Sequence, residues 1–207
     1  TGKINIRKEK DRFMCENSNS ERLCCETINQ SSTDFGQIYA IIPAAGKGNR
    51  YGEPKVDATY KDKTFLRHIL DTLSLTPVGG VKVVRDIETS DMLESVKHGI
   101  NCARKDGWNA LGWLIWPVDH PLVKAETIIL LIESFWQYPE RIINPVYKKR
   151  RGHPIIIPDS LKLSEELKSQ GLRSIIAQAG LERYDVTVSD PNVIRNINYS
   201  EDVLKSV

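Results

Sequence analysis

A glycine-rich turn after an apolar run is the part of the chain best suited to hold an anion. Residues 38–42 read IYAII and predict a strand buried on both faces. Four small residues follow: Ala44, Ala45, Gly46 and Gly48. Three cations come next: Lys47, Arg50 and Lys55. A strand-to-helix connection with surface lysines could look similar. The combination nevertheless favours a site where backbone N–H groups and cations hold a phosphate chain.

The loop does not follow the better-known phosphate-binding patterns. Its G-x-G-x-x-x-G spacing is one residue longer than the dinucleotide fingerprint, and no G-K-[ST] follows. Residues 44–55 instead resemble the A-A-G-x-G-x-R-M-G-x-P-K signature of MobA-like nucleotidyltransferases, most closely the molybdenum-cofactor cytidylyltransferase branch. Tyr51 replaces the usual Met, and Pro43, which has no N–H to donate, replaces the usual Leu.

The resemblance implies a nucleoside triphosphate over this loop. Arg50 and Lys55 would neutralise its phosphates and so count as catalytic. The nucleotide-binding residues implied are Ala44, Ala45, Gly46, Gly48, Arg50, Lys55 and, in the later M-L-E-S element, Ser95. Ala45 fits the cytidylyltransferase branch, since guanylyltransferases of the family usually have Gly there, and CTP is the favoured nucleotide.

Asp119, in the segment Trp-Pro-Val-Asp-His-Pro, follows a second apolar run that a proline ends. A carboxylate there could hold a hard cation against phosphate oxygens, or could cap the helix predicted near Ala125. The residues alone leave the two roles about even. Similarity to the family's D-Q-P motif, whose Asp binds Mg²⁺, favours the metal. His120 replaces Gln and could contact the acceptor or serve the structure.

The segment Arg-Arg-Gly-His-Pro resembles the R-x-G-H-P-V motif of the cytidylyltransferase branch. It implies that Gly152 and His153 line an acceptor pocket. The basic residues 148–151 suit an anionic acceptor, although a solvated basic hairpin explains Lys148 and Lys149 as well. Arg173 resembles the Arg of the family's G-x-R and could bind the acceptor phosphate or simply start a helix.

The segment 195–202 resembles the family's D-I-D-T-P-E-D or N-I-N-T-P-E-E. By that resemblance Asn198 is a metal ligand beside Asp119, with Mg²⁺ as the expected cofactor. Amides at Asn196 and Asn198 replace two carboxylates of the cytidylyltransferase pattern, which leaves less negative charge for the cation.

Hydrophobic periodicity predicts alternating helices and strands. The helices are expected at residues 64–75, 92–103, 125–138, 161–168, 173–179 and 200–206. Further strands are expected at residues 81–84, 112–118, 142–147, 154–157 and 183–188. This order, together with the resemblance, predicts an α/β fold: a Rossmann-like three-layer sandwich with a mostly parallel sheet, similar to nucleotide-diphospho-sugar transferases. Relatives usually have an additional strand and helix where this chain has only residues 76–92.

Length and composition fit one α/β domain, in a chain of 207 residues that is 40% hydrophobic. The resemblance places the nucleotidyltransferase domain at residues 38–207. Residues 1–37 are more polar and are expected to form an N-terminal extension, a surface appendage or mobile lead-in. A net charge of +2 gives no strong field for nucleic acid or membrane. No apolar run reaches the roughly 20 residues of a membrane span, and no signal peptide is recognisable, so a cytoplasmic location is expected.

Four cysteines form no C-x-x-C pair: Cys15, Cys24, Cys25 and Cys102. Adjacent Cys24 and Cys25 suit a tetrahedral metal poorly, and the remaining spacing matches no zinc template. Reduced thiols are therefore expected, with a redox or metal role for Cys15, Cys24 and Cys25 as the weaker alternative.

Together these features predict a nucleotidyltransferase that moves CMP from CTP onto a phosphorylated small molecule, with Mg²⁺ and release of pyrophosphate. The resemblance implies a molybdopterin-type acceptor first and a sugar phosphate second, and an acceptor enzyme as a partner for cofactor delivery. The alternative is a non-catalytic nucleotide-binding or cofactor-chaperone domain, which the short 76–92 segment and the two amides favour.

Overall fold

A mixed β-sheet forms the centre of the computed structural model, which describes residues 24–29, 37–44, 58–85, 91–161, 163, 171–178 and 180–197. The strand order is β1-β5-β2-β6-β9-β7-β10, and β8 pairs with β7. The strands of this sheet are β1 (Cys24–Asn29), β2 (Ile38–Pro43), β5 (Gly80–Arg85), β6 (Gly112–Ile115), β7 (Ile142–Tyr147), β8 (Arg150–Arg151), β9 (Ile155–Pro158) and β10 (Arg183–Thr187). A separate hairpin consists of β3 (Thr59–Tyr60) and β4 (Lys63–Thr64).

The central strands are parallel. Strand β2 pairs in parallel with both β5 and β6, and β10 pairs in parallel with β7. Strands β1 and β9 are antiparallel to their neighbours. Because β5, β2 and β6 run in one direction, their carboxyl ends meet at one edge of the sheet, where α/β proteins bind ligands.

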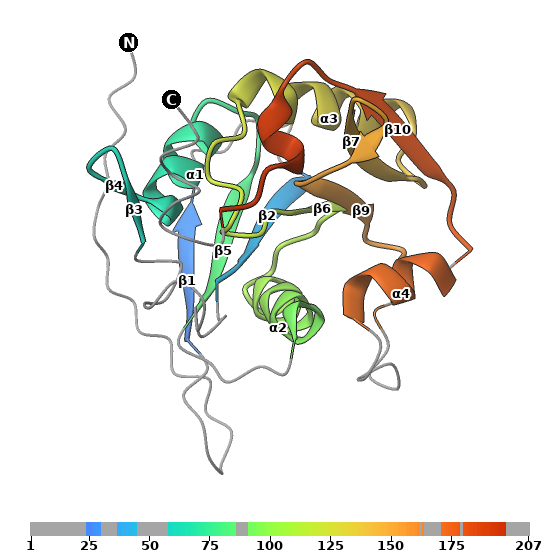
Figure 1. The fold of residues 1–207 in the computed structure, drawn as a ribbon. Helices are drawn as coiled ribbons and strands as arrows, with labels where there is room; N and C mark the ends of the chain where they lie inside the picture. Colours follow the sequence, from blue (N-terminus) through green and yellow to red (C-terminus); the bar gives the residue numbers. More distant parts are fainter. Residues whose placement is uncertain are drawn as a thin grey trace.

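Helices cover both faces of the sheet, so the fold has three layers (Figure 1). Helices α1 (Phe65–Leu73) and α3 (Ala125–Gln137) lie on one face. Helices α2 (Met92–Lys105) and α4 (Gly171–Gln178) lie on the other. A 3₁₀ helix, η2 (Pro191–Ile194), follows β10. The expected α/β three-layer class is confirmed.

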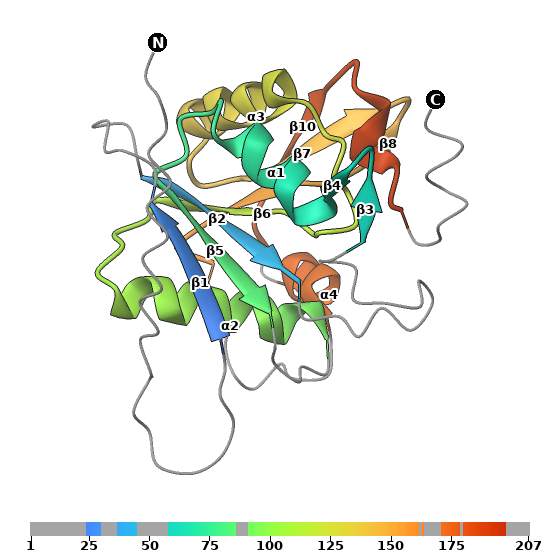
Figure 2. The ribbon, with the colours of Figure 1, turned by 90° about the vertical axis from the view of Figure 1, so that its left-hand side faces the viewer.

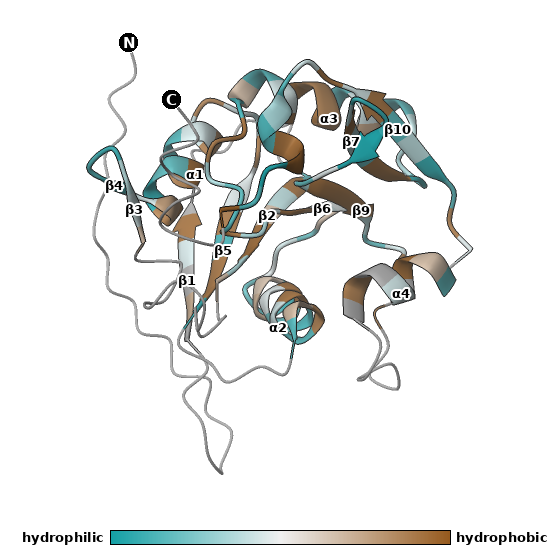
Figure 3. Ribbon diagram, viewed as in Figure 1, coloured by the Kyte–Doolittle hydropathy of each residue, from teal (hydrophilic) through white to brown (hydrophobic). Residues whose placement is uncertain are grey.

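Alternation along the buried strands divides the core between the two faces. In β2, Ile38, Ala40 and Ile42 belong to the core that packs under α1 and α3. Their neighbour Ile41 belongs to the core against α2 and α4. Successive strand residues point to opposite faces, and apolar residues on both faces are what a sheet between two helix layers requires. Figure 3 shows the resulting hydrophobic strands inside more hydrophilic outer segments.

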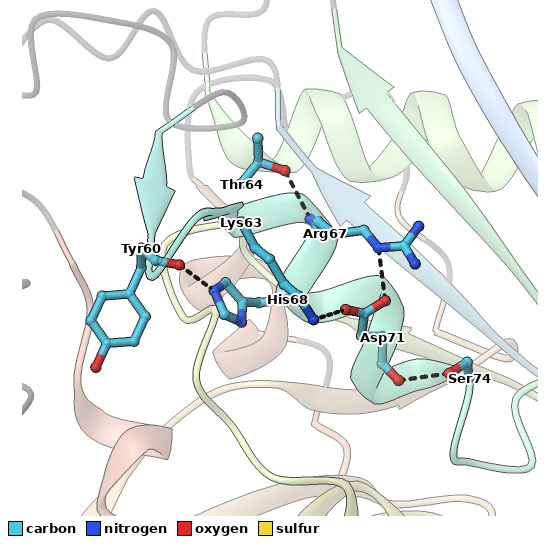
Figure 4. A network of polar contacts seen from close by, with 7 residues as sticks. All are labelled: Tyr60, Lys63, Thr64, Arg67, His68, Asp71 and Ser74. Carbon is cyan, nitrogen blue, oxygen red and sulfur yellow. Dashed lines mark hydrogen bonds and ion pairs between the residues drawn. The ribbon is translucent and has the colours of Figure 1, made fainter.

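Helix α1 is held to the β3–β4 hairpin by a local polar network (Figure 4). Thr64 is its N-cap, with Oγ1 accepting the backbone N–H of Arg67 at 3.1 Å. Asp71 pairs with Arg67 one turn later at 2.8 Å. His68 contacts the carbonyl oxygen of Tyr60 at 2.7 Å. The cap at Thr64 explains why the helix begins at Phe65, one residue after the predicted start.

Most predicted elements are confirmed with shifted ends, and β7 has the predicted bounds. Strand β6 ends at Ile115 instead of residue 118, because Pro117 has no N–H for the ladder. The helix predicted at 200–206 and most of that predicted at 161–168 lie outside the described residues. No helix in the described part of the chain is long and apolar enough to cross a membrane.

Strand β1 lies within the segment that the sequence analysis treats as an N-terminal extension. It pairs antiparallel with β5, with Cys25 opposite Val84 and Asn29 opposite Gly80. The sequence analysis predicted no strand there. Residues 24–29 therefore form one edge of the main sheet (Figure 2).

Candidate active site

Asp119 lies in a tight turn just beyond the carboxyl end of β6. The backbone N–H of Trp116 still pairs with the carbonyl oxygen of Ile41 in β2, at 3.0 Å. The N–H of His120 then donates to the carbonyl oxygen of Pro117 at 3.1 Å and closes the turn. Asp119, whose side chain is 22% exposed, is thereby presented at the edge where the parallel strands end.

The glycine-rich loop leaves the sheet at the same edge. Ile41 of β2 is in register with Ile115 of β6, and the N–H of Ala44 donates to Val84 of β5 at 2.9 Å. The loop therefore begins beside the turn that carries Asp119. The other predicted loop residues lie outside the described part of the chain: Ala45, Gly46, Gly48, Arg50 and Lys55.

A cavity of about 300 Å³ opens at this edge. Its lining includes Asp119, His120, Arg150, Gly152, His153 and Asn196. These residues come from three segments that are far apart in the sequence. The cavity thus unites four predicted site residues, one for the metal and three for the acceptor.

The imidazole of His120 lies near the Asp119 carboxylate, and the imidazole of His153 lies beside that of His120. The ring centroids of His120 and His153 are 5.3 Å apart, and His120 Nε2 is 3.8 Å from Asp119 Oδ1. His120 is held from two sides: its Nδ1 is 3.4 Å from the carbonyl oxygen of Asn192, and its own carbonyl accepts Trp116 Nε1 at 2.9 Å. A phosphorylated molecule in the cavity would meet two oriented imidazole rings.

Gly152 is needed for a close approach of two backbone segments. Its N–H donates to Pro145 at 2.9 Å, and the N–H of His153 donates to Val193 in η2 at 2.7 Å. A Cβ on Gly152 would lie 2.1 Å from the carbonyl oxygen of Val193, a distance that real structures do not tolerate. The glycine therefore has a packing role as well as its place in the cavity lining.

The buried carboxylate of Asp190 organises this region from behind. Its Oδ2 accepts the N–H of Lys124, the N-cap residue of α3, at 2.9 Å and the hydroxyl of Thr127 at 3.1 Å. Its Oδ1 accepts the N–H of Asn192 in η2 at 3.0 Å. The N-cap residue of α3 is Lys124, which makes no side-chain cap bond, and it is Asp190 that satisfies the Lys124 N–H at this helix start. The capping explanation for Asp119 is removed.

The four basic residues at 148–151 divide into two pairs. Lys148 and Lys149 form the turn between β7 and β8, with φ values of 47° and 65°, and match the hairpin alternative. Arg150 and Arg151 line the cavity. Arg151 makes a bidentate pair with Asp185 at 2.8 and 2.9 Å, and this hydrogen bonding raises the pKa of Arg151. Arg150 is then the cation better placed to serve an anionic acceptor.

One of the two predicted metal ligands, Asp119, is within the described part of the chain, and the residue before the other one bonds to it. The N–H of Ile197 donates to the carbonyl oxygen of Asp119 at 2.8 Å. Asn198, the next residue, lies outside the described part. A carboxylate and an amide oxygen are ligands that Mg²⁺ and Mn²⁺ accept, so the donor set fits a hard divalent cation.

Two predicted residues lie on helices away from these turns. Ser95 is buried in the first turn of α2, and Arg173 belongs to α4, where the position of its side chain lies outside the description. Their assigned roles stay predictions. Among the residues that the prediction missed, Asp190 and Asn192 had a readable signal, because Asp-Pro-Asn is a typical start of a short helix.

The sequence matches the MobA-like NTP transferase domain family over residues 40–184. No curated protein matches it. Among solved structures, Rv0371c from Mycobacterium tuberculosis H37Rv superposes with a TM-score of 0.66 at 20% identity, covering 83% of this chain and 100% of that one. The complex of Rv0371c with manganese superposes with a TM-score of 0.61 at 19% identity, covering 83% of this chain and 100% of that one. The 2-C-methyl-D-erythritol 4-phosphate cytidylyltransferase from Thermus thermophilus superposes with a TM-score of 0.58 at 13% identity, covering 82% of this chain and 96% of that one. At these identities the likeness establishes the shared fold.

Proposed function

Because the chain belongs to the MobA-like NTP transferase domain family and is a nucleotidyltransferase, we propose that it moves CMP from CTP onto a phosphorylated small molecule and releases pyrophosphate. One observation carries the proposal: the Asp119 turn and the start of the glycine-rich loop both follow the carboxyl ends of the parallel neighbours β6 and β2. The preference for CTP rests on Ala45 and on the resemblance to cytidylyltransferases. A molybdopterin-type phosphate is the first acceptor to test, and a sugar phosphate the second.

The proposed division of labour follows the two sides of the site. The loop after Ala44 holds the triphosphate with its backbone N–H groups, and Arg50 and Lys55 neutralise the phosphate charge. The cavity holds the acceptor, with His120 and His153 as polar contacts and Arg150 as the cation for its phosphate. Ser95 and Arg173 are assigned to nucleotide and acceptor as secondary contacts.

Asp119 and Asn198 are the proposed ligands for a divalent cation. The cation would neutralise phosphate oxygens and hold the triphosphate in an attackable geometry. Mg²⁺ is the expected ion, and the manganese complex of Rv0371c supports the class of ion. The hydrogen bond between the N–H of Ile197 and the carbonyl oxygen of Asp119 supports this role, because Ile197 directly precedes Asn198 in the chain.

In the reaction, an oxygen of the acceptor phosphate attacks the α-phosphorus, and the bond to pyrophosphate breaks. Such chemistry asks the protein mainly for positioning and charge stabilisation, so no nucleophilic Ser or Cys is required. The turn closed by His120 and Pro117 fixes the Asp119 carboxylate, and η2 fixes the His153 backbone, before the substrates bind. Preorganisation of this kind avoids reorganisation during the reaction.

The test is pyrophosphate release with CTP, GTP, ATP and UTP, each with the candidate acceptors, in Mg²⁺ or Mn²⁺. Asp119→Asn should lower turnover by about 10²–10³-fold, the scale of a lost charge-stabilising group. Glu133→Gln removes one carboxylate from the exposed side of α3 and should leave turnover unchanged. Wild-type turnover in a folded Asp119→Asn variant would overturn the proposal. Triphosphate binding without turnover on any acceptor would favour the non-catalytic alternative.

A further inference from the structure

Three metal-binding side chains meet between α2 and the edge strand β1, on the face of the sheet opposite to α3. Cys25 comes from β1, and His98 and Cys102 come from α2. One ligand atom of each lies within 4.8 Å of the other two, and Cys102 Sγ is 3.2 Å from His98 Nε2. All three side chains are half-buried. This cluster takes no part in the proposed nucleotidyl transfer.

The backbone explains why these residues meet. His98 and Cys102 are four residues apart, so they stack on one side of the helix. Gly99 lets α2 lie close to the sheet, because a Cβ there would be 2.8 Å from methyl groups of Ile41 and Val84. Cys25 is the partner of Val84 across the β1–β5 pair. Figure 2 shows α2 running beneath these strands.

We propose that Cys25, His98 and Cys102 bind one zinc-type divalent cation, with solvent as the fourth ligand. Tetrahedral zinc has Zn–S distances of about 2.3 Å and Zn–N distances of about 2.0–2.1 Å, which places its ligand atoms roughly 3.6–3.8 Å apart. The observed distances bracket that spacing, with Cys102 Sγ and His98 Nε2 at 3.2 Å and all three ligand atoms within 4.8 Å of one another. Thiolate and imidazole together select zinc over Mg²⁺ or Ca²⁺, which prefer oxygen.

Charge balance agrees with this assignment. Two thiolates and one neutral imidazole compensate a dication, so the loaded site is formally neutral, as a half-buried place favours. The nearby Lys82 ammonium has its own partners: it donates to Asp106 and to Thr27 of β1, and lies 5.0 Å from the centre of the Trp108 ring. Lys82 therefore does not need the thiolates as counter-ions.

This site is separate from the proposed catalytic cation. Met92, at the start of α2, lines the active-site cavity. At 1.5 Å per helical residue, His98 and Cys102 lie roughly 9 and 15 Å further along the helix axis. The two sites also differ in chemistry, with sulfur and nitrogen here and oxygen at Asp119. A cation at the cluster would tie the edge strand β1 to the helix that reaches the active site.

The experiment is a Co²⁺ titration of the full chain, reduced and stripped of metal, followed by absorbance. One equivalent should give a sulfur-to-cobalt charge-transfer band with tetrahedral ligand-field bands, which Zn²⁺ then abolishes. His98→Gln and Cys102→Ser should each weaken cobalt binding. Loss of a residue that only supports a metal ligand typically costs ~10–100-fold in affinity, and loss of a ligand itself should cost more. Absence of the charge-transfer band, or equal affinity in both variants, would overturn the proposal.

Two controls separate this site from other thiol or metal chemistry. Cys24→Ser, which changes the other cysteine of β1, and Asp119→Asn, which changes the proposed catalytic ligand, should bind cobalt like the wild type. Zinc should raise the melting temperature of the wild type and of Cys24→Ser but not of Cys102→Ser.

A loss of cobalt binding in Cys24→Ser equal to that in Cys102→Ser would show non-specific thiol binding. A Cys25–Cys102 disulfide that persists under the reducing conditions would identify a redox pair. Either result would overturn the metal assignment.

Discussion

Asp119 and Asp190 are two carboxylates near α3 that sequence alone does not separate. Hydrogen bonds separate them, because Asp190 accepts from Lys124 and Asn192 while Asp119 lines the cavity. The metal role of Asp119 stays a prediction, which rests on its place after an apolar strand and on the resemblance to the family's D-Q-P motif. Its exclusion as the cap of α3 could not be predicted, because the carboxylate that accepts the N–H of Lys124 at the start of α3 lies 66 residues away in the sequence.

Lys55 is the residue on which the proposed triphosphate site is most easily tested. Lys55→Ala should weaken CTP binding by about 1–3 kcal/mol, because a charge-assisted contact to phosphate is lost. Titration calorimetry measures the change directly. Lys105→Ala, at the exposed end of α2, removes the same charge away from the cavity and serves as the control. Equal affinity in Lys55→Ala would remove Lys55 from the site.

The thiol of Cys102 should titrate in an unusually acidic range. A hydrogen bond from Cys25, followed by contacts with His98 and the charge of Lys82, lowers the pKa of Cys102 from 9.0 to about 5 although burial opposes this. Since only the thiolate attacks iodoacetamide, alkylation of Cys102 in the metal-free chain should rise with pH through a midpoint near 5.

Mass spectrometry of Cys102 over a pH series measures that midpoint. Cys25→Ala removes the largest stabilising contact of the thiolate and should move the midpoint upward, toward the ordinary value. A wild-type midpoint close to 9.0 would contradict the assigned hydrogen bonding.

At the scale of single elements, a helix or strand could be predicted only where its own residues carry the pattern that specifies it. The spacing of Phe65, Leu66 and Ile69 predicts α1, and these residues are buried in the structure. Strand β1 could not be predicted, because Cys24–Asn29 reads CCETIN and has only one large apolar residue. Its extended conformation depends on pairing with β5, which is a long-range interaction. The β3–β4 hairpin is too short to give a periodic pattern.

Asp190 joins two elements, so its loss should cost more than the loss of an ordinary cap. Asp190→Ala removes the bonds to α3 and to η2, and two caps at about 0.5–2 kcal/mol each predict a loss of roughly 1–4 kcal/mol in the free energy of unfolding. Because η2 also carries Val193 and Asn192, which hold His153 and His120, the variant should raise the KM for the acceptor.

Urea denaturation and steady-state kinetics check the two parts of this prediction. Asp91→Ala is the matched control, since Asp91 caps only α2 through the N–H of Glu94 at 3.0 Å. It should cost about 0.5–2 kcal/mol. A smaller loss for Asp190→Ala than for Asp91→Ala would show that Asp190 does not join the two elements.

At the scale of the whole molecule, the site is assembled by sheet topology. Asp119 and the loop after Ala44 meet because β2 and β6 are parallel neighbours. Gly152 and His153 meet the 191–197 segment because β7, β8 and η2 pack together. The sequence motifs identified the candidate site residues. Which of these residues line the same cavity follows from the sheet topology. Residues 76–92, although short, still provide β5 and the start of α2.

The edge strand β1 makes residues 24–29 part of the main sheet, and its contribution to the domain can be tested by truncation. A chain that begins at residue 37 lacks β1, so β5 becomes an exposed edge and Lys82 loses the Thr27 hydroxyl. The loss should be at least ~1.5–3 kcal/mol, the scale of one hydrogen bond to a charged group, and the exposed edge should promote self-association.

A chain that begins at residue 22 keeps β1 and is the matched control. Thermal unfolding and light scattering over a concentration series compare both truncated chains with the full chain. The shorter truncation should retain the melting temperature more closely, because the β1–β5 pairing from Cys25 opposite Val84 to Asn29 opposite Gly80 survives. If the chain from residue 37 were as stable and monomeric as the full chain, β1 would contribute nothing to the domain. Residues 1–37 would then act as the appendage that their composition suggests. The structure predicts the opposite, because β1 covers the sheet edge on which Lys82 is buried.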